Sequence, residues 1–165
     1  MSRLDSVIRR LSAQRDLLNH AAALIAGRAG HVLEISLGNG RTFDHLRALM
    51  PEREIFVFDR RNAAHPDSTP DAVHMFLGDF AETLPAAARR LGPRAALAHC
   101  DIGSGDRATT AALAQWLCPA LAPLLAPGAV VLADQPLTLP DAVPLPQPAS
   151  VPAGRYFCFR LGGPR

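Results

Sequence analysis

The sequence predicts an α/β domain with a doubly wound, mostly parallel sheet and helices on both of its faces. From position 31 to 61 the chain reads as strand, glycine turn, helix and strand, and the second strand ends on an acid. Further along, short apolar runs alternate with segments of helical periodicity. Strands that alternate with helices favour parallel pairing through right-handed crossovers.

The first strand–turn–helix–strand unit carries the strongest local signals. The run 32–37 is almost continuously apolar, which is typical of a strand buried on both faces of a sheet. Gly38 and Gly40 follow, and glycine permits positive φ and a close approach to the backbone. A helix leads to a second apolar run at 55–58, and Asp59 stands at its carboxyl end. In such a unit the ligand site lies outside the carboxyl ends of the strands.

Residues 1–28 precede this unit and are predicted to be helical. Ser2 and Asp5 have the spacing of a capping box. An apolar stripe over 4–11 and a second apolar stretch over 17–26 predict two helices, with Gly27 closing the second. These helices either cover the ligand cleft or pack on the edge of the sheet.

The remaining segments continue the alternation of strands and helices, but they are too few to complete the second half of a doubly wound sheet. Strands are predicted at 72–77, 95–99 and 129–133, and helices at 82–91 and 107–118. The segment 138–153 is rich in proline, so we expect a loop there. A last strand at 155–161 is expected to pair antiparallel at or near the edge, where it would be free to pair with a second copy across a two-fold axis. The C-terminal part is therefore abridged.

Composition indicates one domain with a sizeable core. The 165 residues are 48% apolar and carry a net charge of +2. All 17 basic residues are arginine, scattered along the chain rather than clustered with aromatics, so nucleic acid is not the expected partner. The three cysteines match no metal or disulfide spacing and are expected to be buried thiols of a cytoplasmic protein. The uncharged run 116–133 is interrupted by prolines, so no membrane span is expected.

The glycine turn decides which nucleotide the domain is expected to bind. A dinucleotide fingerprint needs a third glycine where Phe43 stands, and a P-loop needs a lysine, which the chain lacks. The segment E-I-S-L-G-N-G at 34–40 resembles motif I of the class I S-adenosylmethionine-dependent methyltransferases. The resemblance covers about 31–133 and is close to a small single-domain family described only as S-adenosyl-L-methionine methyltransferase. Ser36 departs from the motif, because a glycine usually stands there.

The resemblance implies a Rossmann-like core over 31–135 that binds S-adenosylmethionine. Asp59, at the end of its strand, is expected to accept the ribose hydroxyls. By resemblance Glu34 lies under the methionyl amino group, Asp79 accepts the adenine amino group, and Phe80 lies against the adenine ring or packs in the core. The full expected set of cofactor-binding residues is Glu34, Ser36, Leu37, Gly38, Asn39, Gly40, Arg41, Thr42, Asp59, Arg60, Asp79, Phe80 and Asp101.

Catalytic residues are harder to assign, because in-line methyl transfer needs orientation more than a dedicated base. By resemblance, Asp101 is expected to face the transferring methyl. His99 is either a general base or a hydrogen-bonded core residue. No metal is expected; the alternative is a magnesium site made by Asp101, Asp134 and Gln135, as in catechol-type O-methyltransferases.

Three functions therefore stay open at this point. The favoured one is a methyltransferase that acts on a small molecule. The second is a module that binds S-adenosylmethionine without catalysis, suggested by Ser36 and the abridged C-terminal part. The third is an NAD(P)-dependent oxidoreductase, suggested by Arg60 and Arg61.

Overall fold

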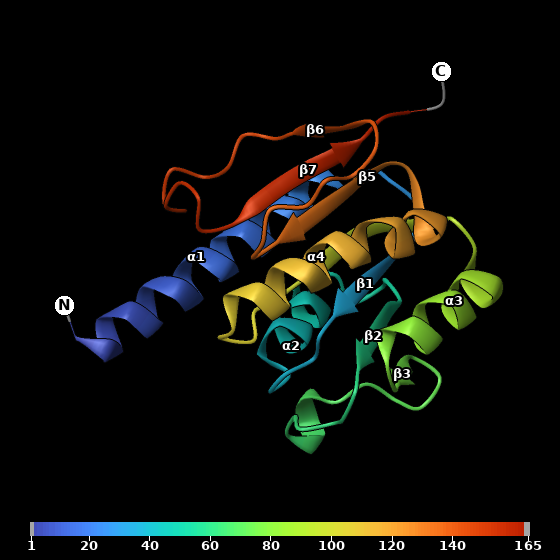
Figure 1. The fold of residues 1–165 in the computed structure, drawn as a ribbon, viewed down its shortest axis with the longest axis horizontal. Helices are drawn as coiled ribbons and strands as arrows, with labels where there is room; N and C mark the ends of the chain where they lie inside the picture. Colours follow the sequence, from blue (N-terminus) through green and yellow to red (C-terminus); the bar gives the residue numbers. More distant parts are fainter. Residues whose placement is uncertain (1, 164–165) are drawn as a thin grey trace.

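The structure, a computed structural model, describes residues 2–163 and confirms the doubly wound α/β fold (Figure 1). Within these residues seven strands form one sheet in the order β3-β2-β1-β4-β5-β7-β6. Strands β1 to β5 pair in parallel, and β7 runs antiparallel to both β5 and β6. The strands are β1 (His31–Ile35), β2 (Ile55–Asp59), β3 (Met75–Leu77), β4 (Ala95–Cys100), β5 (Leu125–Ala133), β6 (Ala142–Pro144) and β7 (Phe157–Leu161).

Helices cover the two faces of the sheet in pairs. The described helices are α1 (Arg3–Leu24), α2 (Arg41–Leu49), α3 (Phe80–Leu91) and α4 (Arg107–Leu121), with short 3₁₀ turns η1 (Pro66–Ser68) and η2 (Ala122–Leu124). One core cluster joins α1 and α2 to Val32 and Leu97, and a second joins α3 and α4 to Leu33. Neighbouring residues of β1 thus enter opposite cores, which explains its continuous apolar run. No helix in residues 2–163 is long and apolar enough to cross a membrane.

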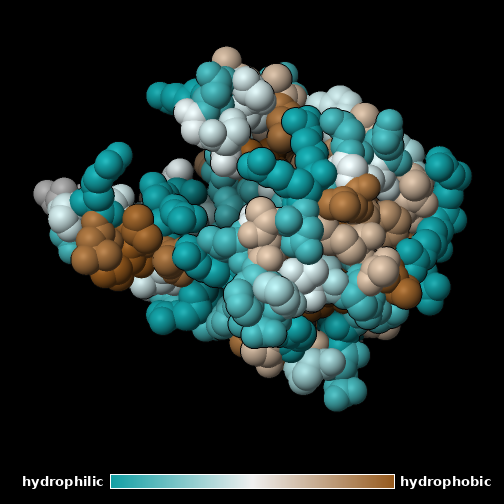
Figure 2. Space-filling model, turned by 90° about the horizontal axis from the view of Figure 1, so that it is seen from below, coloured by the Kyte–Doolittle hydropathy of each residue, from teal (hydrophilic) through white to brown (hydrophobic). Residues whose placement is uncertain are grey.

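The N-terminal segment forms one long helix, so the prediction of two helices was wrong. Nothing between the two apolar stripes breaks the helix, and Ser2 and Asp5 form the expected capping box at its start. The core-facing side begins at Ala13, while Leu4, Val7 and Ile8 stay exposed. The N-terminal half of α1 extends past the carboxyl ends of the parallel strands (Figure 1), and its apolar side chains form a patch beside a hollow (Figure 2).

The C-terminal part contains a strand that the sequence did not predict. Residues 142–144 form β6 within the proline-rich segment, because an edge strand tolerates a proline such as Pro144. The last strand is antiparallel, as expected, but it lies between β5 and β6. Its backbone is therefore paired on both sides, which removes the free edge on which the expected pairing between two copies depended. No helix connects β5 to β6 in the described chain, so the second half is abridged.

Ser36 occupies a backbone conformation that normally belongs to glycine. Its φ is 84°, and Asp141 is the other non-glycine residue of the described chain with positive φ. The Ser36 N–H donates to the carbonyl of Phe58 at 2.8 Å, which holds the turn against β2. The motif's turn is thus formed even though a serine stands in the glycine position, at a cost of order 1–2 kcal/mol in backbone strain.

Replacing Ser36 by glycine should therefore stabilise the protein. Relief of the strain outweighs the roughly 0.5–1 kcal/mol by which glycine favours the unfolded chain. We expect the free energy of unfolding to rise by up to about 1 kcal/mol, or a Tm higher by roughly 2–4 °C at this chain length. Urea and thermal unfolding measure it, with Ser36→Ala as the control that keeps the strain. A glycine variant less stable than the alanine variant would contradict the strain argument.

Candidate functional site

A small cavity lies at the glycine turn, at the carboxyl ends of the parallel strands. Its volume is about 120 Å³, and its walls come from α1, the turn, the start of α2 and the end of β4. The lining residues are Arg10, Leu11, Gln14, Ser36, Leu37, Gly38, Asn39, Arg41, Thr42 and Asp101. The structure therefore brings together most of the residues predicted from the turn. A larger cavity of about 890 Å³, beside His31 and Arg94, contains none of the predicted cofactor residues.

The two glycines of the turn have different roles. A methyl group added at Gly38, where φ is +54°, would meet no atom within 4 Å. A methyl group added at Gly40 would lie 2.4 Å from the carbonyl oxygen of Ser68 and 2.9 Å from the side chain of Ala64. Gly40 therefore permits close contact with the β2–β3 loop, which fills the space that a side chain at this position would need. Gly38 is the glycine that borders open space.

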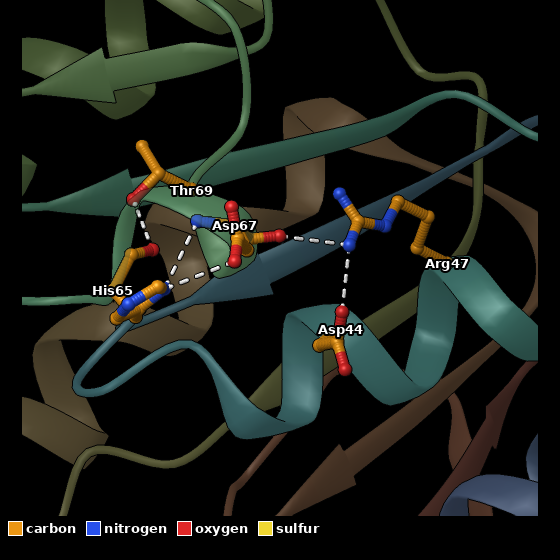
Figure 3. A network of polar contacts seen from close by, with 5 residues as sticks. All are labelled: Asp44, Arg47, His65, Asp67 and Thr69. Atoms are coloured by element: carbon orange, nitrogen blue, oxygen red, sulfur yellow. Dashed lines mark hydrogen bonds and ion pairs between the residues drawn. The ribbon is translucent and has the colours of Figure 1, made fainter.

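The β2–β3 loop is fastened onto α2 by a polar network (Figure 3). Arg47 of α2 donates to the carboxylate of Asp44 at 2.6 Å and to the backbone carbonyl of Asp67 at 2.9 Å. Within the loop, His65 accepts from the N–H of Asp67 at 3.3 Å, and the Thr69 hydroxyl donates to the carbonyl of His65 at 3.0 Å. These bonds hold the loop against Gly40 and so fix the outer wall of the turn.

Asp59 is bonded to the turn itself. Its Oδ2 accepts the N–H groups of Leu37 at 2.9 Å and Gly38 at 3.0 Å, and its Oδ1 accepts the N–H of Arg61 at 3.2 Å. A carboxylate offers about four acceptor sites, and three are taken. The carboxylate thus has room for about one further donor, whereas the sequence argument assigned it both ribose hydroxyls.

Beneath the turn, Glu34 and His99 form a buried pair across β1 and β4. Glu34 is fully buried, and its carboxylate accepts from the Thr42 hydroxyl and from Nδ1 of His99, the latter at 2.8 Å. Burial lowers the pKa of His99, but the charge and hydrogen bond of Glu34, with smaller contributions from Asp101 and Asp134, together outweigh burial and raise the pKa above the usual value. The partners of the Glu34 carboxylate are thus a histidine and a threonine. His99 is only 2% exposed and bonded to Glu34, which is the arrangement expected of a hydrogen-bonded core residue.

Asp101 has a partner that sequence reasoning missed. Gln14, on the buried side of α1, donates from Nε2 to Oδ2 of Asp101 at 2.9 Å. This bond ties α1 to the end of β4 across the cavity. A glutamine inside the otherwise apolar face made by Ala13, Leu17 and Leu18 was the available sequence signal.

The residues of the alternative magnesium site are engaged within the protein. Asp134 accepts the N–H groups of Ile102 at 3.0 Å and Gly103 at 2.9 Å, and Gln135 turns its amide nitrogen toward the same carboxylate at 3.2 Å. Burial, followed by the nearby Asp101 carboxylate, raises the pKa of Asp134 against these bonds. Among residues 2–163 no group of three or more His, Cys, Asp and Glu side chains could hold a metal ion. Asp134 therefore anchors the loop after β4.

The residues expected at the adenine end lie at the end of β3. Asp79 caps α3 by accepting the N–H of Ala81 at 2.9 Å, and its other oxygen pairs with Arg60 at 3.1 Å. A 2′-phosphate beside Arg60 would also lie near this acid and be repelled by it, which argues against the NADP alternative. Phe80 belongs to the apolar core, so the alternative of core packing holds for this ring.

Comparisons with known proteins agree with this geometry. The family model described as S-adenosyl-L-methionine methyltransferase matches residues 1–161. A crystal structure of an S-adenosyl-L-methionine methyl transferase from Silicibacter pomeroyi DSS-3 is 42% identical, with a TM-score of 0.92 over 98% of this chain and 99% of that one. No curated protein matches the sequence.

More distant structures share the fold alone. Cofactor-bound Rv0187 from MTB is 17% identical, with a TM-score of 0.56 over 97% of this chain and 91% of that one. The plantazolicin methyltransferase BpumL, solved in complex with SAH, is 11% identical, with a TM-score of 0.55 over 78% of this chain and 49% of that one.

Asp59→Ala should destabilise the protein as well as weaken cofactor binding. The change leaves the N–H groups of Leu37 and Gly38 without their acceptor, and a lost bond to a charged group costs about 1.5–3 kcal/mol. Urea unfolding measures the stability, and calorimetry with S-adenosylhomocysteine measures the affinity. Glu52→Ala, on the exposed segment after α2, is the control and should stay within about 0.5 kcal/mol. Equal stability of the two variants would contradict the anchoring role of Asp59.

The His99 imidazole should titrate above its ordinary pKa of about 6.5. Glu34→Gln removes the charge that raises this pKa and leaves the burial that lowers it, so the pKa should then fall below about 6.5. NMR of the imidazole carbons reports both values. Because the folded pKa is raised, the pair's contribution to stability is complete below about pH 6.5 and is lost as the pH rises through the folded pKa. A pKa that is the same in both proteins would contradict the pairing.

Proposed function

The chain belongs to the S-adenosyl-L-methionine methyltransferase family, and we propose that the acceptor of its methyl group is a small molecule. The observation that carries this proposal is the confined space at the turn. The cavity of about 120 Å³ at the turn is roofed by α1, and a neighbouring cavity of about 280 Å³ lies between α1 and α2. Once the cofactor occupies the turn, the space that remains beneath α1 suits a small organic acceptor.

The residues at the turn fit the methionine end of S-adenosylmethionine. Gly40 offers no side-chain cap to α2, and the N–H of Arg41 donates to Oδ1 of Asn39 at 3.4 Å, so the N–H groups after Arg41 are the ones left for a carboxylate. The open space beside Gly38 admits the ligand close to the backbone. Whole-ligand pockets usually measure about 300–1,000 Å³, so we assign the 120 Å³ cavity to the methionine end alone. The adenosine end then lies along the exposed ends of β2 and β3.

Acids at the strand ends are assigned to the adenosine end. Asp59 has acceptor capacity for about one ribose hydroxyl beyond its bonds to the turn. Asp79 is half-exposed and is the acid assigned to the adenine amino group, with its Arg60 pair keeping it in place. Glu34 is assigned an indirect role, because its carboxylate accepts a hydrogen bond from the Thr42 hydroxyl and so positions the start of α2.

Asp101 is the residue assigned to the reacting end. It lines the cavity, and Gln14 holds its carboxylate in one orientation. The bound cofactor supplies a methyl group activated by its sulfonium. The chain then has to orient the acceptor, and holding reactants in line contributes up to roughly 7–11 kcal/mol. No base is assigned, since His99 is buried and bonded to Glu34.

Two measurements test the function. Calorimetry should show binding of S-adenosylhomocysteine and no binding of NADPH. Methyl-labelled S-adenosylmethionine is then incubated with the protein and a cell extract, and ultrafiltration separates small products from macromolecules. Label in the small-molecule fraction supports the proposal. Label confined to RNA or protein would leave the methyltransferase assignment intact and overturn the small-molecule acceptor.

Gly38→Asn should reduce S-adenosylhomocysteine affinity by at least tenfold, about 1.4 kcal/mol, while the protein stays folded. Asparagine tolerates the left-handed backbone, and its side chain would extend into the open space at the turn. Gly154→Asn is the matched control, because Gly154 also has positive φ and open surroundings but lies outside the turn. Calorimetry should show unchanged affinity for the control. A Gly38→Asn variant that binds as tightly as the control would contradict the assignment of the turn.

A further inference from the structure

Another cavity, which adjoins the one at the glycine turn, is lined by cationic side chains. It measures about 210 Å³ and lies between the N-terminal half of α1 and the loop before β7. Its lining consists of Ser6, Arg9, Arg10, Pro152 and Arg155. No carboxylate belongs to this lining, and no ion pair recorded within residues 2–163 involves any of the three arginines. The cavity therefore gathers positive charge without a counter-charge from the protein.

The segments that carry these arginines are held together by a buried tyrosine. The Tyr156 hydroxyl lies 3.5 Å from the backbone carbonyl of Arg10, to which it donates. Tyr156 is 3% exposed, and its own carbonyl accepts from Gln147 at 2.8 Å. The N–H of Arg155 donates to the carbonyl of Pro152 at 3.1 Å, which closes a turn beside Tyr156. The backbone on both sides of the cavity is thus fixed.

Arg10 connects this cavity to the one at the glycine turn. It lines both, and in the turn cavity it shares the lining with Asp101 and Gln14. Charged groups from both cavities also influence the pKa of the Tyr156 phenol. Burial and then the Asp101 carboxylate raise its pKa, while Arg10 and Arg155 oppose them. The arginine cavity therefore adjoins the place assigned to the reacting end.

We propose that this cavity binds an anionic group of the methyl acceptor, a carboxylate or a phosphate, while another atom of the acceptor lies beside Asp101. The proposal rests on the proposed function and specifies its substrate class. Guanidinium groups bind both anions through paired hydrogen bonds, and an anion relieves the mutual repulsion of Arg9, Arg10 and Arg155. Because the anionic group is held apart from the accepting atom, the methylated product keeps its negative charge.

Inorganic phosphate is the first probe. We expect saturable shifts of the arginine Nε–Hε NMR signals of Arg9, Arg10 and Arg155 in protein saturated with S-adenosylhomocysteine. The double variant Arg9→Gln/Arg155→Gln should bind phosphate at least tenfold more weakly and S-adenosylhomocysteine equally well. The control is Arg3→Gln/Arg89→Gln, which removes the same charge outside the cavity. Shifts that do not saturate, or equal phosphate affinity in both double variants, would overturn the proposal.

The labelled product supplies the second test. At pH 8 the labelled small molecule should be retained by an anion-exchange resin, and its formation should need at least tenfold more acceptor with Arg9→Gln/Arg155→Gln than with the control. A neutral or cationic product would overturn the anionic class. Tight binding of single-stranded RNA that depends on the same arginines would assign the cavity to nucleic acid instead. If S-adenosylhomocysteine itself fails to bind, the proposed function fails, whatever phosphate does.

Discussion

The hydrogen bonds between the Asp59 carboxylate and the backbone of Leu37 and Gly38 are the constraint on which the site depends. They join the end of β2 to the turn after β1, so the two strands and the turn form one rigid unit. The turn includes Ser36, whose backbone is strained at a φ of 84°. Gly40 lets the β2–β3 loop pack against it without a side chain between them. The turn and the strand ends beside it are therefore joined by hydrogen bonds to the backbone and by close packing.

Most of the acids at the carboxyl edge of the sheet have partners within the protein. Asp79 caps α3 and pairs with Arg60, while Asp134 accepts backbone N–H groups of the loop after β4. Such bonds fix the position of a carboxylate and use up part of its acceptor capacity. Asp101 differs, since its recorded partner is a side chain of α1, which makes it the acid best placed to respond to what enters beneath that helix.

The parts of the molecule outside the parallel sheet shape the mouth of the site. The N-terminal half of α1 reaches past the strand ends and places Arg10, Leu11 and Gln14 at the cavity. The abridged C-terminal part adds the segment before β7, whose buried Tyr156 holds it against α1. The N-terminal helix and the segment before β7 thus form a cavity together, and the pairing of β7 with β5 brings them close.

The sequence alone determined the βαβ core, the order of elements from β1 to β5 and the residues of the glycine turn, because buried strands, glycines and strand-end acids are local patterns. It misplaced what depends on partners distant in the chain. The packing of the β2–β3 loop against Gly40, the pairing of Glu34 with His99 and the covering of β7 by β6 were decided by the tertiary structure. The Gln14–Asp101 bond spans 87 positions. Only the tertiary structure brings such residues together, since a local sequence pattern does not specify which distant residue will pack against it.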